Sequence, residues 1–452
     1  MVYNYHFLES PTRGQCQYPF MIPIITIVGR PNVGKSTLFN RLTKARDALT
    51  GKLPGLTRDR KYGRGMINGK AYIAVDTGGL TAEKQGIEAL MAEQAQLALH
   101  EAHSILFLVD ARTGLTADDQ KLAAQLRKLN KPIFLAVNKI DGLDEMAWAD
   151  FYALGFSLYP IAAEHNWGID NLMEQVLTPF LIAPHPSTND QRINIAFIGR
   201  PNVGKSTLIN RILGENRVLT YNAPGTTRDS IFIDFQRLHH QYTLIDTAGI
   251  RRRPNITEEF EKFSVLKALQ AIEAAQVVVI LLDAQEDITD QDLKLIGLVI
   301  DYGKALVIAV NKWDGLDPYK RKIWHTELPW RLAFADFVKV HFISALHGTG
   351  VGHLFTAINQ AYRAATKKIA TAKINKLLAK IMEINPPPLA RGKPIKLRYA
   401  HVGGQQPPTI IIHGTRARFT PVNYRKYLVN ILRKELHLTG TPVIVEFKDA
   451  ES

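Results

Sequence analysis

The sequence predicts an α/β protein with two tandem domains of one fold, followed by a smaller α+β domain. Short apolar strand patterns alternate with helical patterns, which is typical of a mostly parallel sheet covered by helices on both faces. The nine-residue segment GRPNVGKST occurs twice, at 29–37 and 199–207. The last 87 residues carry 16 Lys and Arg against 5 Asp and Glu, which is +11 of the formal charge of +14. We therefore expect a duplicated domain and a basic third domain.

The same offset relates other parts of the two halves. Thr57 and Thr227, like Asp76 and Asp246, are 170 residues apart, as are the two nine-residue segments, so the whole domain is duplicated. We expect a disordered N-terminal extension at 1–21, a first domain at 22–183, a linker at 184–192, a second domain at 193–364 and a basic domain at 365–452.

The first domain supplies the strand and helix pattern that the second repeats from residue 193 onward. We expect strands at 24–28, 71–75, 105–109 and 133–137 and helices at 87–102 and 118–129, with further strands at 193–198 and 338–343. Because ligands of open α/β sheets bind beyond the carboxyl ends of the strands, we expect the site residues there.

The basic domain has the predicted order α-β-β-α-β. We expect a helix at 367–384, a strand at 395–399, a Gly/Pro turn at 403–408, a strand at 409–413, a helix at 422–436 and a strand at 443–447. This order fits a three-stranded sheet with helices on one face. The concentration of positive charge indicates a polyanionic partner for this domain.

Composition excludes several classes of protein. No apolar run approaches the roughly 18 residues of a membrane span, and the N-terminus lacks the pattern of a signal peptide, so we expect a cytoplasmic protein. The single cysteine, Cys16, excludes an internal disulfide framework. Residues 1–20 show no periodicity, and Met21 stands directly before the first strand, so translation could also start there. We expect a monomer.

Each nine-residue segment matches the phosphate-binding pattern G-x-x-x-x-G-K-[ST] between a strand and a helix. The glycines let the backbone N–H groups wrap a polyphosphate, the lysine contacts its β- and γ-phosphates, and the serine hydroxyl binds Mg²⁺. The predicted phosphate-binding residues are Gly29, Arg30, Pro31, Asn32, Val33, Gly34, Lys35, Ser36 and Thr37, and Gly199, Arg200, Pro201, Asn202, Val203, Gly204, Lys205, Ser206 and Thr207.

Two further elements follow each phosphate loop in the order that a nucleotide switch needs. The first is PGxTRD, whose Thr57 or Thr227 can close over Mg²⁺ and the γ-phosphate. The second is DxxG, whose Asp holds Mg²⁺ through water and whose Gly N–H meets the γ-phosphate. With the residue that follows it, this element comprises Asp76, Thr77, Gly78, Gly79 and Leu80, and Asp246, Thr247, Ala248, Gly249 and Ile250.

A third element selects the base. In Asn-Lys-x-Asp, the Asp carboxylate accepts two hydrogen bonds from guanine that adenine cannot donate, which indicates GTP and GDP as ligands. The residues are Asn138, Lys139 and Asp141, and Asn311, Lys312 and Asp314. A backbone N–H from Ser344-Ala345 supports the base in the second half, whereas Ala162-Ala163 lacks the hydroxyl, so we expect a looser loop and weaker binding in the first half.

The hydrolytic machinery predicted from these motifs is sparse. We assign catalytic roles to Lys35, Thr57, Gly79, Lys205, Thr227 and Gly249. Leu80 and Ile250 stand where Ras-like switches carry a water-orienting Gln, so we expect slow intrinsic hydrolysis. We interpret Arg251, Arg252 and Arg253 as a solvated or partner-facing basic patch rather than as catalytic residues.

From Pro23 to about Lys448, the chain strongly resembles the EngA/Der family of bacterial ribosome-assembly GTPases. The resemblance rests on the paired GRPNVGKST and PGxTRD segments, on DTGG and DTAGIRRR, on NKID and NKWD, and on EKFSVLKALQAIE at 261–273. It implies a KH-like tail, nucleotide-dependent movement of the two P-loop GTPase domains, and binding of the GTP form to the large ribosomal subunit and its rRNA. It also implies that Asn32 and Asn202 hold a K⁺ ion beside the phosphates.

The chain departs from this pattern in two places. The basic domain lacks the Gly-x-x-Gly loop with which KH modules clamp RNA phosphates, and Pro254-Asn255 stands where a Gly-Lys pair is more typical. The alternatives are a tRNA-modification GTPase, which would need a C-terminal catalytic Cys that this chain lacks, and a membrane-surface GTPase whose tail binds anionic lipid.

Overall fold

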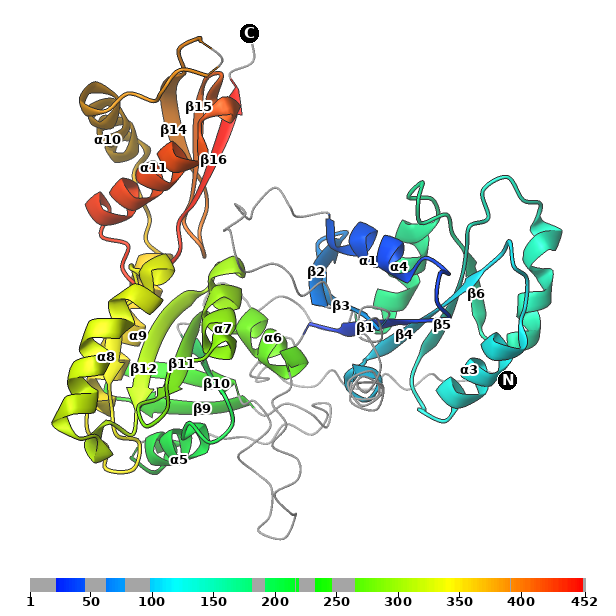
Figure 1. Cartoon of the computed structure of the whole chain (residues 1–452), viewed down its shortest axis with the longest axis horizontal. Helices are drawn as coiled ribbons and strands as arrows, with labels where there is room; N and C mark the ends of the chain where they lie inside the picture. The colour runs from blue at the N-terminus through cyan, green and yellow to red at the C-terminus, as the bar shows by residue number, and fades with distance from the viewer. Residues whose placement is uncertain are drawn as a thin grey trace, which may run out of the picture.

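The computed structural model describes residues 22–44, 62–77, 98–180, 192–215, 217–218, 232–245, 265–390 and 392–449. The expected extension, most of the expected linker and most of the helix expected at 87–102 lie outside these residues. Of that helix, 98–102 are described, and 98–101 are helical. Among the described segments, no helix is both long and apolar enough to cross a membrane. The division into domains remains a prediction, but each part has a sheet of its own (Figure 1).

The first domain contains a six-stranded sheet of order β2-β3-β1-β4-β5-β6. All its neighbouring strands are parallel except β2 and β3, which form an antiparallel hairpin at one edge. The strands are β1 (Ile24–Val28), β2 (Tyr62–Ile67), β3 (Lys70–Asp76), β4 (Ser104–Asp110), β5 (Ile133–Asn138) and β6 (Ser157–Pro160). The described helices are α1 (Lys35–Lys44), α3 (Ala117–Arg127) and α4 (Ile169–Leu177), with 3-10 segments η2 (Glu145–Leu154) and η3 (Thr178–Phe180).

The second domain repeats this arrangement in a seven-stranded sheet of order β13-β12-β11-β7-β10-β9-β8. Its strands are β7 (Ile193–Ile198), β8 (Arg217–Val218), β9 (Phe232–Arg237), β10 (His240–Ile245), β11 (Val277–Asp283), β12 (Ala305–Asn311) and β13 (Val340–Phe342). Its helices are α5 (Lys205–Glu215), α6 (Val265–Ala274), α7 (Asp290–Asp301), α8 (Pro318–Arg331) and α9 (Val351–Ala365), with 3-10 segments η5 (Trp313–Gly315) and η6 (Ala333–Ala335).

The central strands are mostly apolar because both faces of each sheet are covered. All seven residues of β4 and all seven of β11 are buried. In each domain the buried residues fall into two large clusters, which separate the alternating side chains of a strand such as β11. The predicted α/β fold with mostly parallel sheets is therefore confirmed.

The C-terminal domain has the predicted α-β-β-α-β order. It contains α10 (Thr371–Ile384), β14 (Lys396–Gly404), β15 (Thr409–Thr415), η7 (Ala417–Phe419), α11 (Val422–Glu435) and β16 (Ile444–Asp449). Central β15 pairs antiparallel with β14 and parallel with β16. Several predicted boundaries are wrong: α10 starts at Thr371 instead of 367, β15 ends at Thr415 instead of 413, and β16 ends at Asp449 instead of 447. β14 extends through Gly404 because that residue pairs with Thr409, which confines the turn to 405–408.

The C-terminal domain is joined to the second domain by backbone hydrogen bonds. The N–H of Leu306, on β12, donates to the carbonyl of Gly440 at 2.7 Å, and the N–H of Gly440 donates to Phe337 at 2.9 Å. Residue 440 has a φ of +74°, and a Cβ there would lie 2.8 Å from Cβ of Ala361, so only glycine fits without displacement. Arg433 lies 4.3 Å above the Phe337 ring and pairs with Asp336 at 3.0 Å, which extends the contact.

Candidate functional site

The first phosphate loop connects β1 to α1 at the carboxyl end of the sheet. Its backbone passes so close to β4 that a Cβ on Gly29 would lie 2.3 Å from the carbonyl oxygen of Leu108. The Lys35 ammonium lies inside the curve of this loop and donates to the carbonyls of Gly29 at 2.8 Å and Arg30 at 2.6 Å. Burial lowers the pKa of Lys35 from its ordinary value, and the Asp76 carboxylate opposes that shift. In the second domain, Lys205 makes the same two contacts, at 2.9 and 2.6 Å.

Two predicted Mg²⁺ ligands lie side by side in the first domain. The Ser36 hydroxyl, at the first turn of α1, donates to Oδ2 of Asp76 at 2.8 Å. Asp76 ends β3 and is buried, and the hydroxyl of the next residue, Thr77, donates to Ile27 O at 2.7 Å. The oxygens of a hydroxyl and a carboxylate therefore converge beside the phosphate loop, where hard cations find the ligands they prefer.

The base-recognition motif is tied directly to the phosphate loop. Nδ2 of Asn138, at the end of β5, donates to Val33 O at 2.9 Å, and its Oδ1 accepts from the N–H of Ala163 at 2.9 Å. Asn311 makes the equivalent contacts with Val203 and Ala345, both at 2.8 Å. One asparagine in each domain thus joins three loops that are far apart in sequence.

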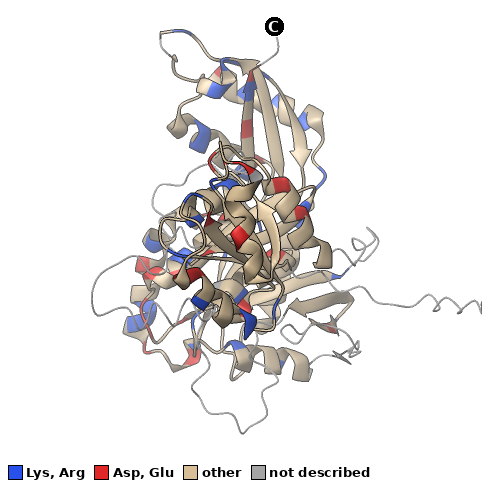
Figure 2. Cartoon of the chain, turned by 90° about the vertical axis from the view of Figure 1, so that its right-hand side faces the viewer, with Lys and Arg blue, Asp and Glu red and all other residues tan. Residues whose placement is uncertain are grey.

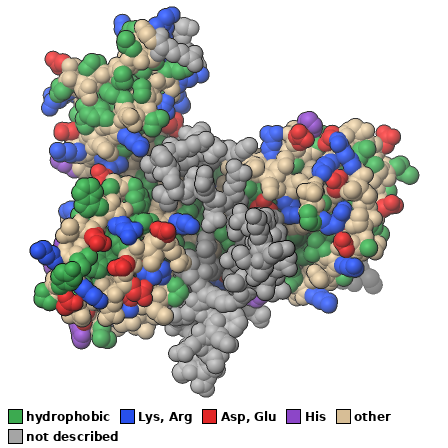
Figure 3. Space-filling view, in the orientation of Figure 1, with side chains coloured by type: hydrophobic (Ala, Val, Ile, Leu, Met, Phe, Trp, Pro, Cys, Tyr) green, Lys and Arg blue, Asp and Glu red, His purple; other side chains and the backbone are tan. Residues whose placement is uncertain are grey.

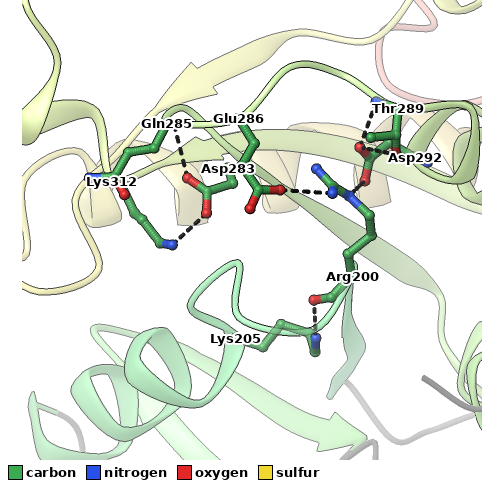
Figure 4. Close-up of polar contacts among 8 residues, drawn as sticks. All are labelled: Arg200, Lys205, Asp283, Gln285, Glu286, Thr289, Asp292 and Lys312. Carbon is green, nitrogen blue, oxygen red and sulfur yellow. Dashed lines mark hydrogen bonds and ion pairs between the residues drawn. The ribbon is translucent and has the colours of Figure 1, made fainter. Parts of the chain in front are cut away.

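The motif lysines extend across the loops and pair with an aspartate at the end of a neighbouring strand. Lys139 Nζ lies 2.6 Å from Oδ2 of Asp110 and also donates to Asn32 O at 2.9 Å. Lys312 forms the corresponding pair with Asp283, which Figure 4 shows above the phosphate loop. These contacts fix the positions of the lysine ammonium groups.

The two base-specificity aspartates differ in their surroundings. Asp141 forms an ion pair with Arg112, whereas Gln285 occupies the matching position in the second domain. The Asp314 pKa is lowered, chiefly by a hydrogen bond from the Ser344 hydroxyl, and His347 lies 3.1 Å from this carboxylate. In the first site, the Asp141 carboxylate that would accept hydrogen bonds from guanine is therefore already paired with the Arg112 guanidinium, which competes with the base.

An arginine in each phosphate loop anchors the loop to a helix later in the same domain, α3 in the first and α7 in the second. Arg30 pairs with Asp119 at 2.8 Å, and Arg200 pairs with Asp292 at 2.9 Å and with Glu286 at 2.8 Å (Figure 4). Asp119 and Asp292 are buried and also complete the capping boxes of α3 and α7.

Sequence reasoning missed the aspartates that pair with the motif lysines and the loop arginines, as well as Arg112, and it also missed a further pair of arginines. Arg41 on α1 donates to Ala163 O at 3.1 Å and also contacts Glu164 O, and Arg211 on α5 donates to Ala345 O at 2.8 Å and also contacts Leu346 O. Both arginines brace the loop that supports the base. These arginines could have been found from the sequence, because Arg41 and Arg211 are 170 residues apart, as are the phosphate-loop residues of the two domains.

The structure brings together every phosphate-loop and base-motif residue that it describes. Several predicted residues lie outside the described part of the chain: Thr57, Gly78, Gly79, Leu80, Thr227, Asp246, Thr247, Ala248, Gly249 and Ile250. Arg251, Arg252 and Arg253 also lie outside it.

Comparisons with known proteins agree with this architecture. A model of the family described as 50S ribosome-binding GTPase matches residues 24–139 and 194–312, and a model described as KH-domain-like of EngA bacterial GTPase enzymes, C-terminal, matches 368–448. The chain is 55% identical over 434 residues to GTPase Der of Legionella pneumophila (strain Lens), covering 96% of this chain and 94% of that protein. It is 52% identical over 435 residues to GTPase Der of Hahella chejuensis and 49% identical over 462 residues to that of Citrobacter koseri, again covering 96% of this chain, with 92% and 94% of those proteins covered.

Proposed function

Because the chain belongs to the Der (EngA) family of GTPases, we propose that it uses GTP binding and hydrolysis in two domains to act in assembly of the large ribosomal subunit. The observation that carries the proposal is the attachment of a domain of charge +11 to the second of the two GTPase domains. Lys and Arg residues are spread over this domain, at the top of Figure 2. Such a surface suits rRNA, whose phosphates dominate protein affinity.

The proposed chemistry uses few protein groups. Lys35 and Lys205 would move from the loop carbonyls to the β- and γ-phosphates, while loop N–H groups bind the other phosphate oxygens. Ser36 and Asp76 suit Mg²⁺, which when bound neutralises charge on the phosphates; Thr57 completes this set by the sequence pattern. Ser206, Thr227 and Asp246 have these roles in the second domain.

A potassium ion beside the phosphates would supply charge that the absent Gln or Arg side chain does not. Asn32 and Asn202 have φ values of 67° and 63°, a left-handed conformation that asparagine tolerates better than most residues. Both asparagines are exposed, so a cation beside the phosphates can reach their side-chain carbonyl oxygens. We propose that both domains hydrolyse GTP slowly and that K⁺ accelerates the reaction.

Nucleotide state would change how the two GTPase domains pack through α6. This helix is the first described element after the DxxG motif at 246–249 and has two apolar sides. Ala268, Ala271 and Ile272 pack on its own domain, and Leu266 and Leu269 pack against the first domain. Gln270 Nε2 donates to Ile22 O at 3.0 Å across the boundary. A shift of α6 would therefore displace one domain relative to the other.

The proposal is tested by cosedimentation with purified large ribosomal subunits at two salt concentrations. Protein with a non-hydrolysable GTP analogue, with GDP or without nucleotide would be compared, together with Lys35→Ala and Lys205→Ala. Binding that requires the analogue and is reduced by either substitution supports a GTP-gated assembly factor. Binding that is absent in every state, or indifferent to nucleotide and lost with modest salt, contradicts it.

A further inference from the structure

The C-terminal sheet has one face covered by helices and one face without them. Residues Leu397, Ala400, Ile410 and Ile412 point into the core that α10 and α11 complete. Figure 1 shows both helices on the same side of β14, β15 and β16. The strand register places the intervening side chains on the opposite face: Lys396, Tyr399, His401, Ile411, His413, Glu446 and Lys448.

Three aromatic rings on this face form one cluster. The centroids of His401 and His413 are 5.1 Å apart with an interplanar angle of 18°, and those of Tyr399 and His401 are 5.7 Å apart with an angle of 25°. Tyr399 lies 6.2 Å from His413 and retains 47% of its exposure. Nδ1 of His401 is buried and has no hydrogen-bond partner among the described residues. Ring contacts therefore join all three residues of the cluster.

The charges around the cluster favour an anion. Lys448 lies directly beside His413 in the register, and Lys396 is the first residue of β14. Both are exposed, and neither forms an ion pair within the described residues. Arg398 is exposed at the bulge next to Tyr399. Glu446, beside Ile411, is the acidic group on this face, since Asp449 points toward Arg418 at 2.6 Å. Figure 3 shows further Lys and Arg side chains around this domain, at the upper left.

We propose that this open face is a platform for single-stranded RNA, on which one or two unpaired bases stack against the cluster of Tyr399, His401 and His413. Lys396, Arg398 and Lys448 would contact the adjoining phosphates. Stacking on exposed aromatic rings combined with basic flanks is how single-stranded nucleic acids are bound without strong sequence preference. The choice of RNA rests on the proposed ribosomal function. The domain then needs no Gly-x-x-Gly loop, because bases and not clamped phosphates supply the contact.

The test measures binding of the full-length protein to fluorescent decauridine and to an abasic decamer of the same charge. Tyr399→Leu removes the ring and should weaken decauridine binding about 10-fold or more, whereas Tyr399→Phe should stay within about twofold. Tyr319→Leu is the matched control, since Tyr319 is 73% exposed on α8 of the second domain. The abasic decamer should bind the unaltered protein about as weakly as decauridine binds Tyr399→Leu.

Equal affinity of the unaltered protein for both decamers would overturn the platform without any variant, because charge alone would then explain binding. Unchanged decauridine binding by a folded Tyr399→Leu protein would overturn it as well. Subunit cosedimentation keeps the two proposals apart. GTP-dependent subunit binding that is unchanged in Tyr399→Leu would support the assembly function and contradict the RNA platform. RNA binding that depends on stacking, in a protein that does not bind the subunit, would support the platform and contradict the assembly function.

Discussion

The side chain of Asn138 lies against the backbone of Gly34, so that a Cβ atom at residue 34 would be 2.4 Å from Asn138 Nδ2. In the second domain the equivalent distance, from residue 204 to Nδ2 of Asn311, would be 2.2 Å. Both glycines also have left-handed backbones, with φ values of +100° and +94°. The contact between the phosphate loop and the base motif therefore requires glycine, which has no side chain, at positions 34 and 204.

Gly34→Ala should separate these loops and abolish nucleotide binding in the first domain alone, and Gly204→Ala should do so in the second. The stoichiometry of a fluorescent GDP analogue should fall from about two to about one per chain in each variant. Gly69→Ala is the control, because residue 69 has a φ of +77° with no atom within 4 Å of a Cβ, so it adds strain without a clash. Retention of both sites in Gly34→Ala would contradict the role of this contact.

The sequence allowed more of the fold to be predicted than of the site's internal contacts. Strand 193–198 was predicted with its observed ends, because an apolar run buried on both faces and bounded by polar residues is distinctive. The pairing of Asp141 with Arg112 could not be predicted, because the two residues are 29 positions apart and meet only when β4 and β5 lie side by side. Gly403 and Gly404 were assigned to a turn by composition, but pairing across the sheet keeps Gly404 in β14.

Arg112 should weaken guanine-nucleotide binding in the first domain, because it competes with the base for Asp141. Arg112→Gln copies the second domain and should raise the affinity for GTP about two- to fivefold, the range expected for an exposed ion pair. Titration with a fluorescent GTP analogue in a Gly204→Ala background reports the first site alone. The reciprocal Gln285→Arg, measured in a Gly34→Ala background, should lower affinity; no change in either variant would show that the pair does not compete.

Potassium should accelerate hydrolysis through the phosphate-loop asparagines. We expect GTPase rates at least tenfold higher in KCl than in NaCl, and loss of this difference when Asn32 and Asn202 are both replaced by Ala. Asn130→Ala is the control, since Asn130 also has a left-handed φ, of 51°, but follows α3 outside the phosphate loops. Equal rates in the two salts would exclude the ion.

Asp301 should destabilise the second domain at neutral pH. Burial raises the pKa of this carboxyl from 3.8 to about 6, so the folded protein binds the proton more tightly than the unfolded chain does. The destabilisation is absent below pH 4 and fully present above pH 6. Asp301→Asn should therefore raise the free energy of unfolding by about 2–3 kcal/mol at pH 7.5 and by little at pH 4.

Chemical denaturation monitored in the second domain, at a series of pH values, measures this difference. Asp290→Asn is the matched control, because Asp290 is exposed in the first turn of the same helix, where its negative charge is favourable. That substitution should be neutral or slightly destabilising at every pH. A stability gain for Asp301→Asn that does not depend on pH would mean that packing, and not ionisation, is responsible.

Arg64 and Glu273 should hold the two GTPase domains together. They form an ion pair across the boundary, Arg64 lies 5.9 Å from the Tyr302 ring, and Lys304 Nζ donates to the Glu273 carbonyl at 2.6 Å. Arg64→Gln or Glu273→Gln leaves a partly buried charge without its partner, which costs about 1–3 kcal/mol. Each substitution should therefore favour a separated arrangement, seen as a larger radius of gyration in solution scattering.

The double variant decides whether the pair acts as a unit. Because removing either partner already breaks the contact, Arg64→Gln with Glu273→Gln should separate the domains no further than the more affected single variant does. Lys121→Gln, which breaks the exposed Asp118–Lys121 pair within α3, should leave the scattering unchanged. If the effects of the two single variants simply add, Arg64 and Glu273 do not act as a pair. The contact that then holds the domains together is the apolar packing of Leu266 and Leu269 on α6, and a nucleotide-driven shift of that helix must break it.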